Sequence, residues 1–310
     1  MGLKILKTGS FLPENIIENS YFEKYLDTSD EWIKKRTGIE KRRISKDIDV
    51  CDLSKKAVED LNLLDEEKSK IKLVIVSSLS ADYIMPSISS NICGHLNLHK
   101  EILAFDLNMA CTGFVGASIL AEKYLEIDEY AIVVGTEVLS KYMDFNNREN
   151  AILFGDGSGA VLYKKTVDNF SCDSGTLYSK DLSLIGKSLD KESSFIEMNG
   201  KNVYRFTMEY VPESIRKTIE MSSYSEDEID YFVLHQANMR IIKGIAKRFG
   251  GIEKYFTNLN KFGNTSSATI PICLDEMNKK NLLKENQKLL LSGFGGGLNY
   301  STCIVLSGGK

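Results

Sequence analysis

The sequence predicts an α/β protein in which two similar halves enclose a layer of buried helices. Short apolar segments rich in β-branched residues alternate with segments of helical periodicity. Two of the helical segments carry no charge, and the order of elements in the first half recurs in the second. Strands that alternate with helices are typical of α/β folds, and a helix that is apolar on every face is buried on every side.

The predicted strands are short and do not alternate between polar and apolar residues, which is typical of sheets covered on both faces. They span residues 73–79, 104–107, 130–135, 151–154, 160–163, 230–235, 289–292 and 302–306. Helical patterns lie between them, over roughly residues 50–61, 86–97, 112–126, 211–222, 238–249 and 265–279. Strand–helix–strand alternation predicts mainly parallel sheets.

Two of these helices are expected to form a central layer between two sheets. No residue from Thr112 to Ala121 is charged, and the same holds from Thr265 to Leu274. Small residues in both stretches keep the helices thin enough for close packing. Pro271 lies in the second stretch and is expected to remove a hydrogen bond or to kink that helix.

The two halves share an order of elements rather than sequence identity. In each, an apolar strand is followed by a helix, a short extended segment, the buried helix and a second apolar strand. A polar stretch, Lys164–Asn169, separates them. We therefore expect an N-terminal half over residues 1–168 and a C-terminal half over 169–310, related so that equivalent loops face each other around a shared site.

Composition narrows the class of protein. The chain has 310 residues, 39 Lys and Arg against 43 Asp and Glu, and a net charge of −4, which argues against a protein that binds nucleic acid through a global positive field. No stretch approaches 18 uncharged apolar residues, and the N-terminus lacks a long apolar signal core. We expect a soluble cytoplasmic protein with no membrane contact.

Neither a disulfide framework nor a metal site is expected. The six cysteines are scattered and no two form a CxxC pair. His95 and His99 are four residues apart, but no third ligand lies near them in the sequence. Each cysteine must therefore be judged by its own surroundings.

Three polar residues are candidates for chemistry. Cys111 stands at the start of the first buried helix, where the helix dipole favours a thiolate, although a buried, unreactive cysteine is the alternative. His235 ends an apolar strand, the edge at which α/β folds bind ligands; a hydrogen-bonded structural histidine is the alternative. Asn264 is predicted to match Cys111 in the second half, and helix capping is its alternative role.

Glycines form two further motifs. Gly293–Gly297 follows a buried strand, and its backbone N–H groups could approach a ligand closely, as an oxyanion hole requires. A phosphate loop is the rival interpretation, but no Lys-Ser/Thr pair follows it. Gly155–Gly159 is predicted to be a hairpin turn. Cysteine, histidine, asparagine and a glycine loop together suit acyl transfer through a thiolate.

The sequence resembles the β-ketoacyl-acyl-carrier-protein synthase III branch of the thiolase-like condensing enzymes along essentially its whole length. The motifs that carry the resemblance are Thr28-Ser-Asp-Glu-Trp-Ile33, Arg36-Thr-Gly-Ile39, Ala110-Cys-Thr-Gly-Phe114, Phe154-Gly-Asp-Gly157, His235-Gln-Ala-Asn-Met-Arg240, Gly263-Asn-Thr-Ser266 and Phe294-Gly-Gly-Gly297. It implies a five-layer αβαβα thiolase-like fold from two pseudo-duplicated halves, and a homodimer.

The resemblance also implies a reaction that initiates bacterial fatty acid biosynthesis. Cys111 would take an acyl group from acyl-CoA, and malonyl-acyl-carrier protein (malonyl-ACP) would then lose CO₂ and attack the thioester to give 3-oxoacyl-ACP. His235 and Asn264 would donate hydrogen bonds to the enolate oxygen, and the N–H groups of Cys111 and Gly296 would form the oxyanion hole. No permanently bound cofactor is implied; phosphopantetheine arrives on the carrier protein.

Further residues match binding positions of that family. CoA contacts are implied for Thr28, Trp32, Arg36, Arg148, Gly200 and Asn238. The acyl pocket is implied to include Met85, Leu139, Leu153 and Phe294. A basic patch for the acidic carrier protein is implied for Arg205, Arg240, Lys247 and Arg248, and Lys243 joins the last three at helical spacing; a solvated helix face is the alternative.

The sequence departs from the family pattern at two places. Met85-Pro86 stands where many relatives have Phe before Pro in a pocket wall that the partner subunit contributes, so longer or branched primers could fit. Leu298-Asn-Tyr-Ser301 differs without a clear consequence. Asn264 in place of a second histidine argues against elongating synthases, and the glycine loop lacks the second cysteine of a thiolase. A specialised-metabolite ketosynthase or acyltransferase is the alternative; a non-catalytic subunit is disfavoured because Cys111 is present.

Overall fold

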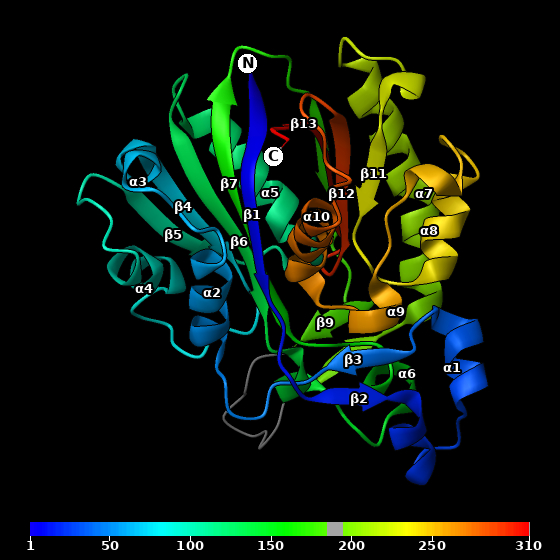
Figure 1. The fold of residues 1–310 in the computed structure, drawn as a ribbon. Helices are drawn as coiled ribbons and strands as arrows, with labels where there is room; N and C mark the ends of the chain where they lie inside the picture. Colours follow the sequence, from blue (N-terminus) through cyan, green and yellow to red (C-terminus); the bar gives the residue numbers. More distant parts are fainter. Residues whose placement is uncertain (185–194, 310) are drawn as a thin grey trace.

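The computed structural model of the protein describes residues 1–184 and 195–309, and within them one nine-stranded sheet forms the centre of the fold (Figure 1). The strand order is β11-β12-β13-β1-β7-β6-β4-β5, and β8 also pairs with β13. The strands are β1 (Gly2–Phe11), β4 (Ile71–Ser77), β5 (Leu103–Leu107), β6 (Tyr130–Glu137), β7 (Gly157–Thr166), β8 (Cys172–Thr176), β11 (Tyr231–Leu234), β12 (Lys288–Gly295) and β13 (Asn299–Ser307).

The sheet consists of two parts with the same pairing pattern. In the first, β4 is parallel to β5 and β6, and β7 is antiparallel to β6 and β1. In the second, β11 is parallel to β12, and β13 is antiparallel to β12 and β8. The counterpart of β5 is reduced to one parallel bridge between Phe232 and Tyr255. A short parallel pairing of β1 with β13, at Lys4↔Leu306 and Ile5↔Ser307, joins the parts.

Helices complete five layers around the two parts of the sheet (Figure 1). Helices α5 and α10 lie between the parts, α2 and α4 cover the outer face of the first, and α7 and α8 cover the outer face of the second. The fold class predicted from the sequence, including the duplicated halves, is confirmed. These helices are α2 (Val50–Glu59), α4 (Ile88–His95), α5 (Gly113–Tyr124), α7 (Gly200–Glu220), α8 (Met239–Ala246) and α10 (Thr269–Lys279).

The central helices are buried because their sequences allow close packing. Gly113, at the start of α5, lies so close to the Ser77 side chain of β4 that a Cβ atom would overlap it. Gly135 of β6 faces the Ser267 carbonyl at the start of α10 in the same way. Pro271 lies in the first turn of α10, where backbone N–H groups have no intrahelical partner, so the expected loss of a hydrogen bond does not arise.

The structure corrects several sequence-based assignments. The sheet is mixed rather than mainly parallel. Residues 151–154, predicted as a strand, complete the short helix α6 (Arg148–Ala151) and the turn after it. Gly155–Gly159 is no hairpin turn, because the segment runs into β7 and its Asp156 side chain is buried, accepting hydrogen bonds from Ser45 and Ser140. Helix α7 begins at Gly200, eleven residues before the predicted start at 211.

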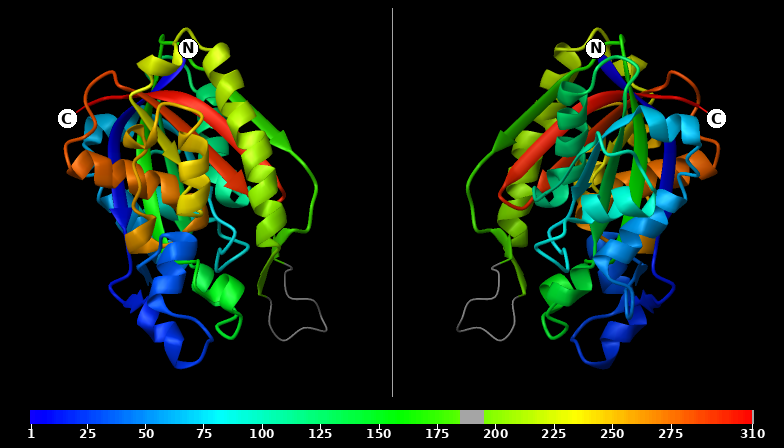
Figure 2. Two further views of the ribbon diagram at one scale, coloured as in Figure 1. Left: turned by 90° about the vertical axis from the view of Figure 1, so that its right-hand side faces the viewer. Right: turned by 90° about the vertical axis from the view of Figure 1, so that its left-hand side faces the viewer.

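Most of the smaller elements gather at one end of the molecule, opposite the N-terminus in both views of Figure 2, whereas α3 lies apart from them, just before β4 (Figure 1). The carboxyl end of β11 points toward this end (Figure 1). Among the described residues, no helix combines the length and apolar character that crossing a membrane requires. The remaining elements are β2 (Ile16–Glu18), α1 (Asp30–Thr37), β3 (Lys41–Arg43), α3 (Asp65–Lys70), β9 (Leu182–Leu184), β10 (Ile196–Met198) and α9 (Leu259–Phe262).

We propose the boundary between residues 168 and 169 as the junction of the two halves. It falls in the connection between β7, which ends at Thr166, and β8, which begins at Cys172. All strands of the first part of the sheet precede this point and all strands of the second part follow it.

Candidate active site

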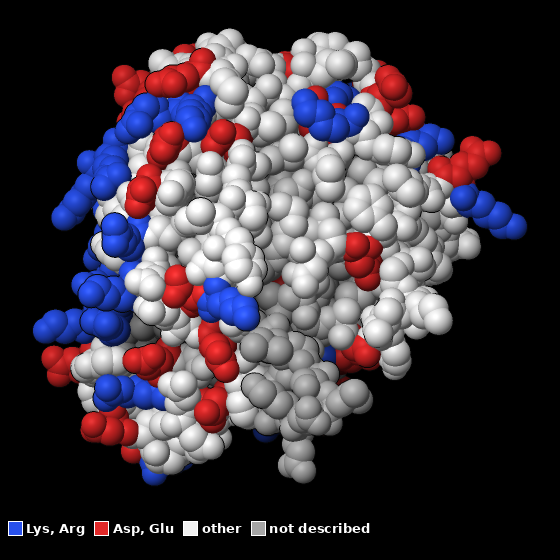
Figure 3. All heavy atoms as spheres, turned by 180° about the vertical axis from the view of Figure 1, so that it is seen from behind, with Lys and Arg blue, Asp and Glu red and all other residues white. Residues whose placement is uncertain are grey.

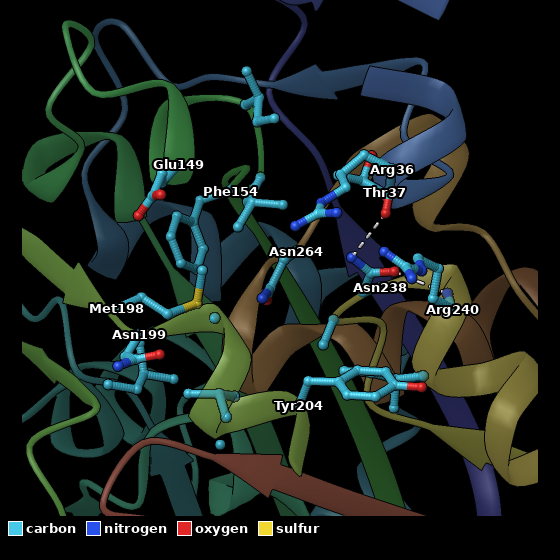
Figure 4. Close-up of a pocket in the computed structure, with 18 of the residues that line it drawn as sticks. Arg36, Thr37, Glu149, Phe154, Met198, Asn199, Tyr204, Asn238, Arg240 and Asn264 are labelled. Atoms are coloured by element: carbon cyan, nitrogen blue, oxygen red, sulfur yellow. Dashed lines mark hydrogen bonds between the residues drawn. The ribbon is translucent and has the colours of Figure 1, made fainter. Parts of the chain in front are cut away.

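A pocket of about 790 Å³ lies between the two halves and brings the three candidate residues together. Cys111, His235 and Asn264 all line it, and they come from the start of α5, the end of β11 and the loop before α10. Figure 4 shows the Asn264 side chain pointing into the pocket between Phe154 and Asn238. Cys111 is 124 positions from His235 and 153 positions from Asn264 in the chain. The three residues share one cavity because equivalent loops of the two halves face each other.

Cys111 occupies a tight turn, Ala110–Thr112, that leads directly into α5. Ala110 adopts a positive φ of 46°, which is unusual for a residue with a side chain and turns the thiol toward the pocket. Burial raises the pKa of the Cys111 thiol to about 11, although the Ser266 hydroxyl and the Gly296 N–H favour the thiolate. Loss of hydration therefore opposes the thiolate that the helix dipole is expected to favour.

The residue that matches Cys111 in the second half is Ser267 rather than Asn264. Both lie in a turn that opens on a buried helix, and both follow a residue of positive φ, Ala110 in one half and Ser266 in the other. Asn264 instead matches Asn108, since each accepts a hydrogen bond from the backbone N–H two residues later. The sequence-based alignment of Asn264 with Cys111 is wrong by three positions.

His235 is held at the end of β11 by contacts on three sides. Its backbone N–H donates to the Ser292 carbonyl of β12 over 2.8 Å, and its Nδ1 lies 2.8 Å from Thr269 Oγ1. The Phe294 ring packs against the imidazole edge-on, with ring centroids 5.3 Å apart. Burial lowers the pKa of His235 to about 3, so the ring is neutral at physiological pH.

The orientation of the Asn264 side chain follows from one hydrogen bond. Its Oδ1 accepts from the Ser266 N–H over 2.8 Å, which leaves the amide Nδ2 as the group available to a ligand. Its backbone N–H donates to the Leu153 carbonyl and its carbonyl accepts from Gly155. Asn264 therefore presents a fixed donor to the pocket.

The glycine loop closes over the thiol. A Cβ atom on Gly295, which has φ of 157°, would contact the Cys111 sulfur at 2.9 Å. The backbone N–H of the next residue, Gly296, is directed at the same thiol. This contact lowers the pKa of the Cys111 thiol and so offsets part of the rise that burial causes. Only a chain without side chains at these positions can bring backbone N–H groups this close to the sulfur.

The pocket mouth carries most of the residues predicted to bind CoA. Trp32 is exposed on α1, and the Arg148 guanidinium lies 4.8 Å from the centre of its ring. Arg36 is joined to Asn238 by a hydrogen bond from the Asn238 side chain to the Arg36 carbonyl (Figure 4). Gly200, the first residue of α7, also lines the pocket. Thr28, by contrast, is not among the residues that line it.

The basic residues predicted for the carrier protein are exposed on α7 and α8. Arg240, Lys243, Lys247 and Arg248 follow one another along α8 and its end, and Arg205 lies on α7. The Arg248 guanidinium donates to the Met208 carbonyl of α7 over 3.1 Å. Figure 3, a view from behind, shows blue side chains concentrated along its left edge, which is the side of α1, α7 and α8 in Figure 1. Arg240 also reaches the pocket (Figure 4).

The predicted acyl pocket is only partly formed by one chain. Leu153 and Phe294 line the cavity, whereas Leu139 is buried behind it in the hydrophobic core. Met85 is 84% exposed and does not line the pocket of its own chain. A role for Met85 in the pocket of a partner subunit stays a prediction.

Several pocket residues were missed in the sequence. Leu182, Met198 and Tyr204 line the cavity and come from β9, β10 and α7. They belong to no motif, and β9 and β10 are only three residues long; Asn199, whose side chain caps the start of α7 by accepting from the Asn202 N–H, is the one signal that could have placed Tyr204 on a helix. No group of three or more His, Cys, Asp or Glu side chains suited to a metal occurs within residues 1–184 and 195–309.

A thiol, a neutral imidazole and a carboxamide around one pocket of a duplicated five-layer fold define a condensing enzyme of the thiolase-like class. The sequence matches the family described as 3-oxoacyl-[acyl-carrier-protein] synthase III over residues 105–179, and the C-terminal region of that family over residues 219–306. The chain belongs to this family, as the resemblance implied.

Individual relatives extend the match to nearly the whole chain. A β-ketoacyl-[acyl-carrier-protein] synthase III of Clostridium acetobutylicum is 42% identical, with 98% of each chain covered. The crystal structure of 3-oxoacyl-[acyl-carrier-protein] synthase III from Aquifex aeolicus superposes with a TM-score of 0.89 at 32% identity, over 98% of this chain and 99% of that one. The priming β-ketosynthase of the R1128 polyketide pathway gives a TM-score of 0.90 at 27% identity, over 99% and 97%.

Proposed function

We propose that this enzyme condenses an acyl-CoA primer with malonyl-ACP to give 3-oxoacyl-ACP, CoA and CO₂, the step that initiates fatty acid biosynthesis. The observation that carries this proposal is the convergence of Cys111, His235 and the Asn264 amide on one pocket with an aromatic and cationic mouth. The full-length similarity to β-ketoacyl-ACP synthases III supports the same reaction.

Acylation of Cys111 is the first step. The sulfur bonds to the thioester carbonyl carbon, the bond from that carbon to the CoA sulfur breaks, and the thiol proton leaves with CoA. The N–H groups of Cys111 and Gly296 stabilise the oxyanion that forms on the way. The pKa of the Cys111 thiol is about 11, so the sulfur is protonated before acyl-CoA binds. Attack by the sulfur therefore depends on the bound acyl-CoA and on the stabilisation of the oxyanion.

Condensation is the second step. Malonyl-ACP loses CO₂, and the electron pair left on carbon is delocalised onto the thioester oxygen. Asn264 Nδ2 and the pocket-facing nitrogen of His235 donate hydrogen bonds to that oxygen. The carbon then attacks the acyl-Cys111 thioester, the bond to the Cys111 sulfur breaks, and the thiolate that leaves takes up a proton from solvent to restore the thiol. A neutral His235 suits this role because it can donate a hydrogen bond without carrying charge in a dry pocket.

Substrate delivery uses the two exposed regions of the pocket mouth. Trp32 and Arg148 form a stacked pair on which an adenine ring can bind, with Arg36 and Asn238 beside it. The basic patch on α7 and α8 docks the acidic carrier protein, since a local positive surface offsets the repulsion from a chain of net charge −4. The roles of Thr28 and Gly200 in CoA binding remain part of the proposal.

A homodimer is part of the same proposal. The loop before α4 exposes three consecutive apolar side chains: Tyr83, Ile84 and Met85 are 61%, 103% and 84% exposed. Such a run is costly in water and is suited to insertion into a second copy of the chain. In that arrangement Met85 would reach the partner's acyl pocket.

Intact mass measurement tests the proposal. The protein is incubated with acetyl-, isobutyryl- or octanoyl-CoA, and an adduct should appear, map to Cys111 and vanish in Cys111→Ala. Absence of an adduct with every acyl-CoA would contradict the priming role. Malonyl-ACP is then added, and release of CO₂ with a 3-oxoacyl product is required.

A specialised-metabolite ketosynthase or acyltransferase is the second candidate. The similarity to the R1128 priming β-ketosynthase favours it, because that enzyme shares the fold over nearly the whole chain. An acylated Cys111 that transfers its acyl group to a nucleophile other than decarboxylated malonyl-ACP would support this candidate against the first.

A further inference from the structure

The proposed reaction depends on which ring nitrogen of His235 carries the proton. A neutral imidazole carries one N–H, on Nδ1 or on Nε2, and only the nitrogen that bears it can donate. Nδ1 is engaged with Thr269 Oγ1 at 2.8 Å, and no described residue hydrogen-bonds Nε2. Nε2 is therefore the nitrogen available to a substrate in the pocket.

The Thr269 hydroxyl can favour either position of the ring proton, because it can accept a hydrogen bond from Nδ1–H or donate one to Nδ1. Its hydroxyl lies 2.8 Å from His235 Nδ1 and 2.9 Å from the Ser266 carbonyl, but it has a single proton. If the hydroxyl donates to Ser266, it must accept from Nδ1–H, and Nε2 becomes a bare acceptor. If the hydroxyl donates to Nδ1, the ring proton resides on Nε2 and points at the substrate.

The backbone around Thr269 makes the second arrangement possible at little cost. The Ser266 carbonyl already accepts a hydrogen bond from the Thr269 backbone N–H. Turning the hydroxyl toward His235 therefore leaves no buried carbonyl without a donor. Thr269 and His235 are both buried, at 2% and 1% exposure, so bulk solvent has little access to the contact between Thr269 Oγ1 and His235 Nδ1.

We propose that Thr269 is a positioning residue that selects the Nε2–H tautomer of His235. The hydroxyl donates to Nδ1 and thereby directs the only ring proton at the oxygen of the bound malonyl thioester. This inference rests on the proposed function, in which His235 donates to the enolate. No carboxylate contacts the ring among the described hydrogen bonds, so the Thr269 hydroxyl and the Ser266 backbone are the described groups that act on the imidazole.

Two matched variants separate the hydroxyl from the packing. Thr269→Val keeps the branched shape and removes the hydroxyl, and Thr269→Ser keeps the hydroxyl and removes a methyl group. We expect Thr269→Val to acylate Cys111 at the rate of the parent and to lose at least about tenfold in condensation, since a histidine held in the wrong tautomer can lower turnover by about 10⁴-fold. Thr269→Ser should retain most of the condensation rate.

Nitrogen-15 NMR of histidine-labelled protein reads the tautomer directly. The chain has three histidines, and a His235→Asn sample identifies the signals of His235. We expect a pyrrole-type shift at Nε2 and a pyridine-type shift at Nδ1 in the parent and in Thr269→Ser, and a mixture of tautomers in Thr269→Val.

Three outcomes would overturn the inference. They are a parent enzyme with its proton on Nδ1, a Thr269→Val variant with full condensation, and a Thr269→Val variant that loses condensation with an unchanged tautomer. If Thr269→Val does not fold, the tautomer of the parent and the condensation rate of Thr269→Ser still test the inference. If the parent itself fails to release CO₂ from malonyl-ACP, the proposed function is refuted instead. The tautomer read by NMR does not depend on that result.

Discussion

Glu137, a buried carboxyl group near the nucleophile, should make the stability of this protein fall as pH rises from 5 to 8. It is fully buried at the end of β6 and accepts hydrogen bonds from the hydroxyls of Ser80 and Ser267, at 2.6 and 2.8 Å, and from the Leu79 N–H. No cation is among its described partners. Burial therefore raises its pKa from 4.5 to about 7, despite these hydrogen bonds.

The size of the effect follows from that difference in pKa. The folded protein binds the proton more tightly than the unfolded chain, so the stabilisation is complete below pH 4.5 and is lost as pH rises through 7. The rise in pKa from 4.5 to about 7 corresponds to roughly 3 kcal/mol in full, at about 1.36 kcal/mol per pKa unit, and about three quarters of it falls between pH 5 and pH 8. The neutral variant Glu137→Gln has no proton to lose and should lack this decline.

Urea unfolding at pH 5, 6, 7 and 8, followed by circular dichroism at one protein concentration, measures the effect. The informative quantity is the change in free energy of unfolding from pH 5 to pH 8 in Glu137→Gln minus that in the parent, because a constant packing cost of the substitution cancels. Glu101→Gln, at an exposed carboxyl before β5, is the control and should follow the parent. Parallel pH profiles of Glu137→Gln and the parent would refute the reasoning.

Further variants test the site. Asn264→Ala should keep acylation of Cys111, measured by intact mass, and lose about 10²–10³-fold in malonyl-ACP decarboxylation, because one enolate donor is removed; an equal loss in both steps would contradict the assignment. Trp32→Ala should raise KM for acyl-CoA about tenfold in steady-state kinetics, with KM for malonyl-ACP unchanged. Arg248→Glu should raise KM for malonyl-ACP several-fold at low salt, an effect that should shrink in high salt. Since the pKa of His235 is about 3, the rate of condensation should show no loss from its protonation between pH 8 and pH 5, where a histidine of ordinary pKa would lose its neutral form.

The layered fold could be predicted because burial leaves a strong mark on composition. The absence of charge from Thr112 to Ala121 and from Thr265 to Leu274 marked α5 and α10, which the structure places at the centre. Strand β1 was missed although it is interior to the sheet, because Lys4 and Lys7 interrupt its apolar residues. Both lysines reach carboxylates far along the chain, Glu285 and Glu67, which local patterns do not reveal.

The candidate site was predictable at the level of residue type and less so in its supporting contacts. Cys111, His235 and Asn264 each stood at a recognisable boundary of an element, and the structure brings all three to one pocket. The partner of His235, Thr269, lies 34 positions away and has no motif of its own. The wrong match of Asn264 to Cys111 arose because the turns before α5 and α10 can be aligned only by the positive φ of Ala110 and Ser266, which the sequence does not reveal.

The serine that matches Cys111 in the second half gives the duplicated fold an asymmetry with a functional consequence. The Ser267 hydroxyl lies within hydrogen-bond distance of both the Glu137 carboxyl and the Ser77 carbonyl, and Ser267 does not line the pocket. One helix start is thus open to substrate and its twin is closed by polar contacts inside the protein. Among the described residues, the second half therefore supplies the donors His235 and Asn264 to the nucleophile of the first half rather than a nucleophile of its own.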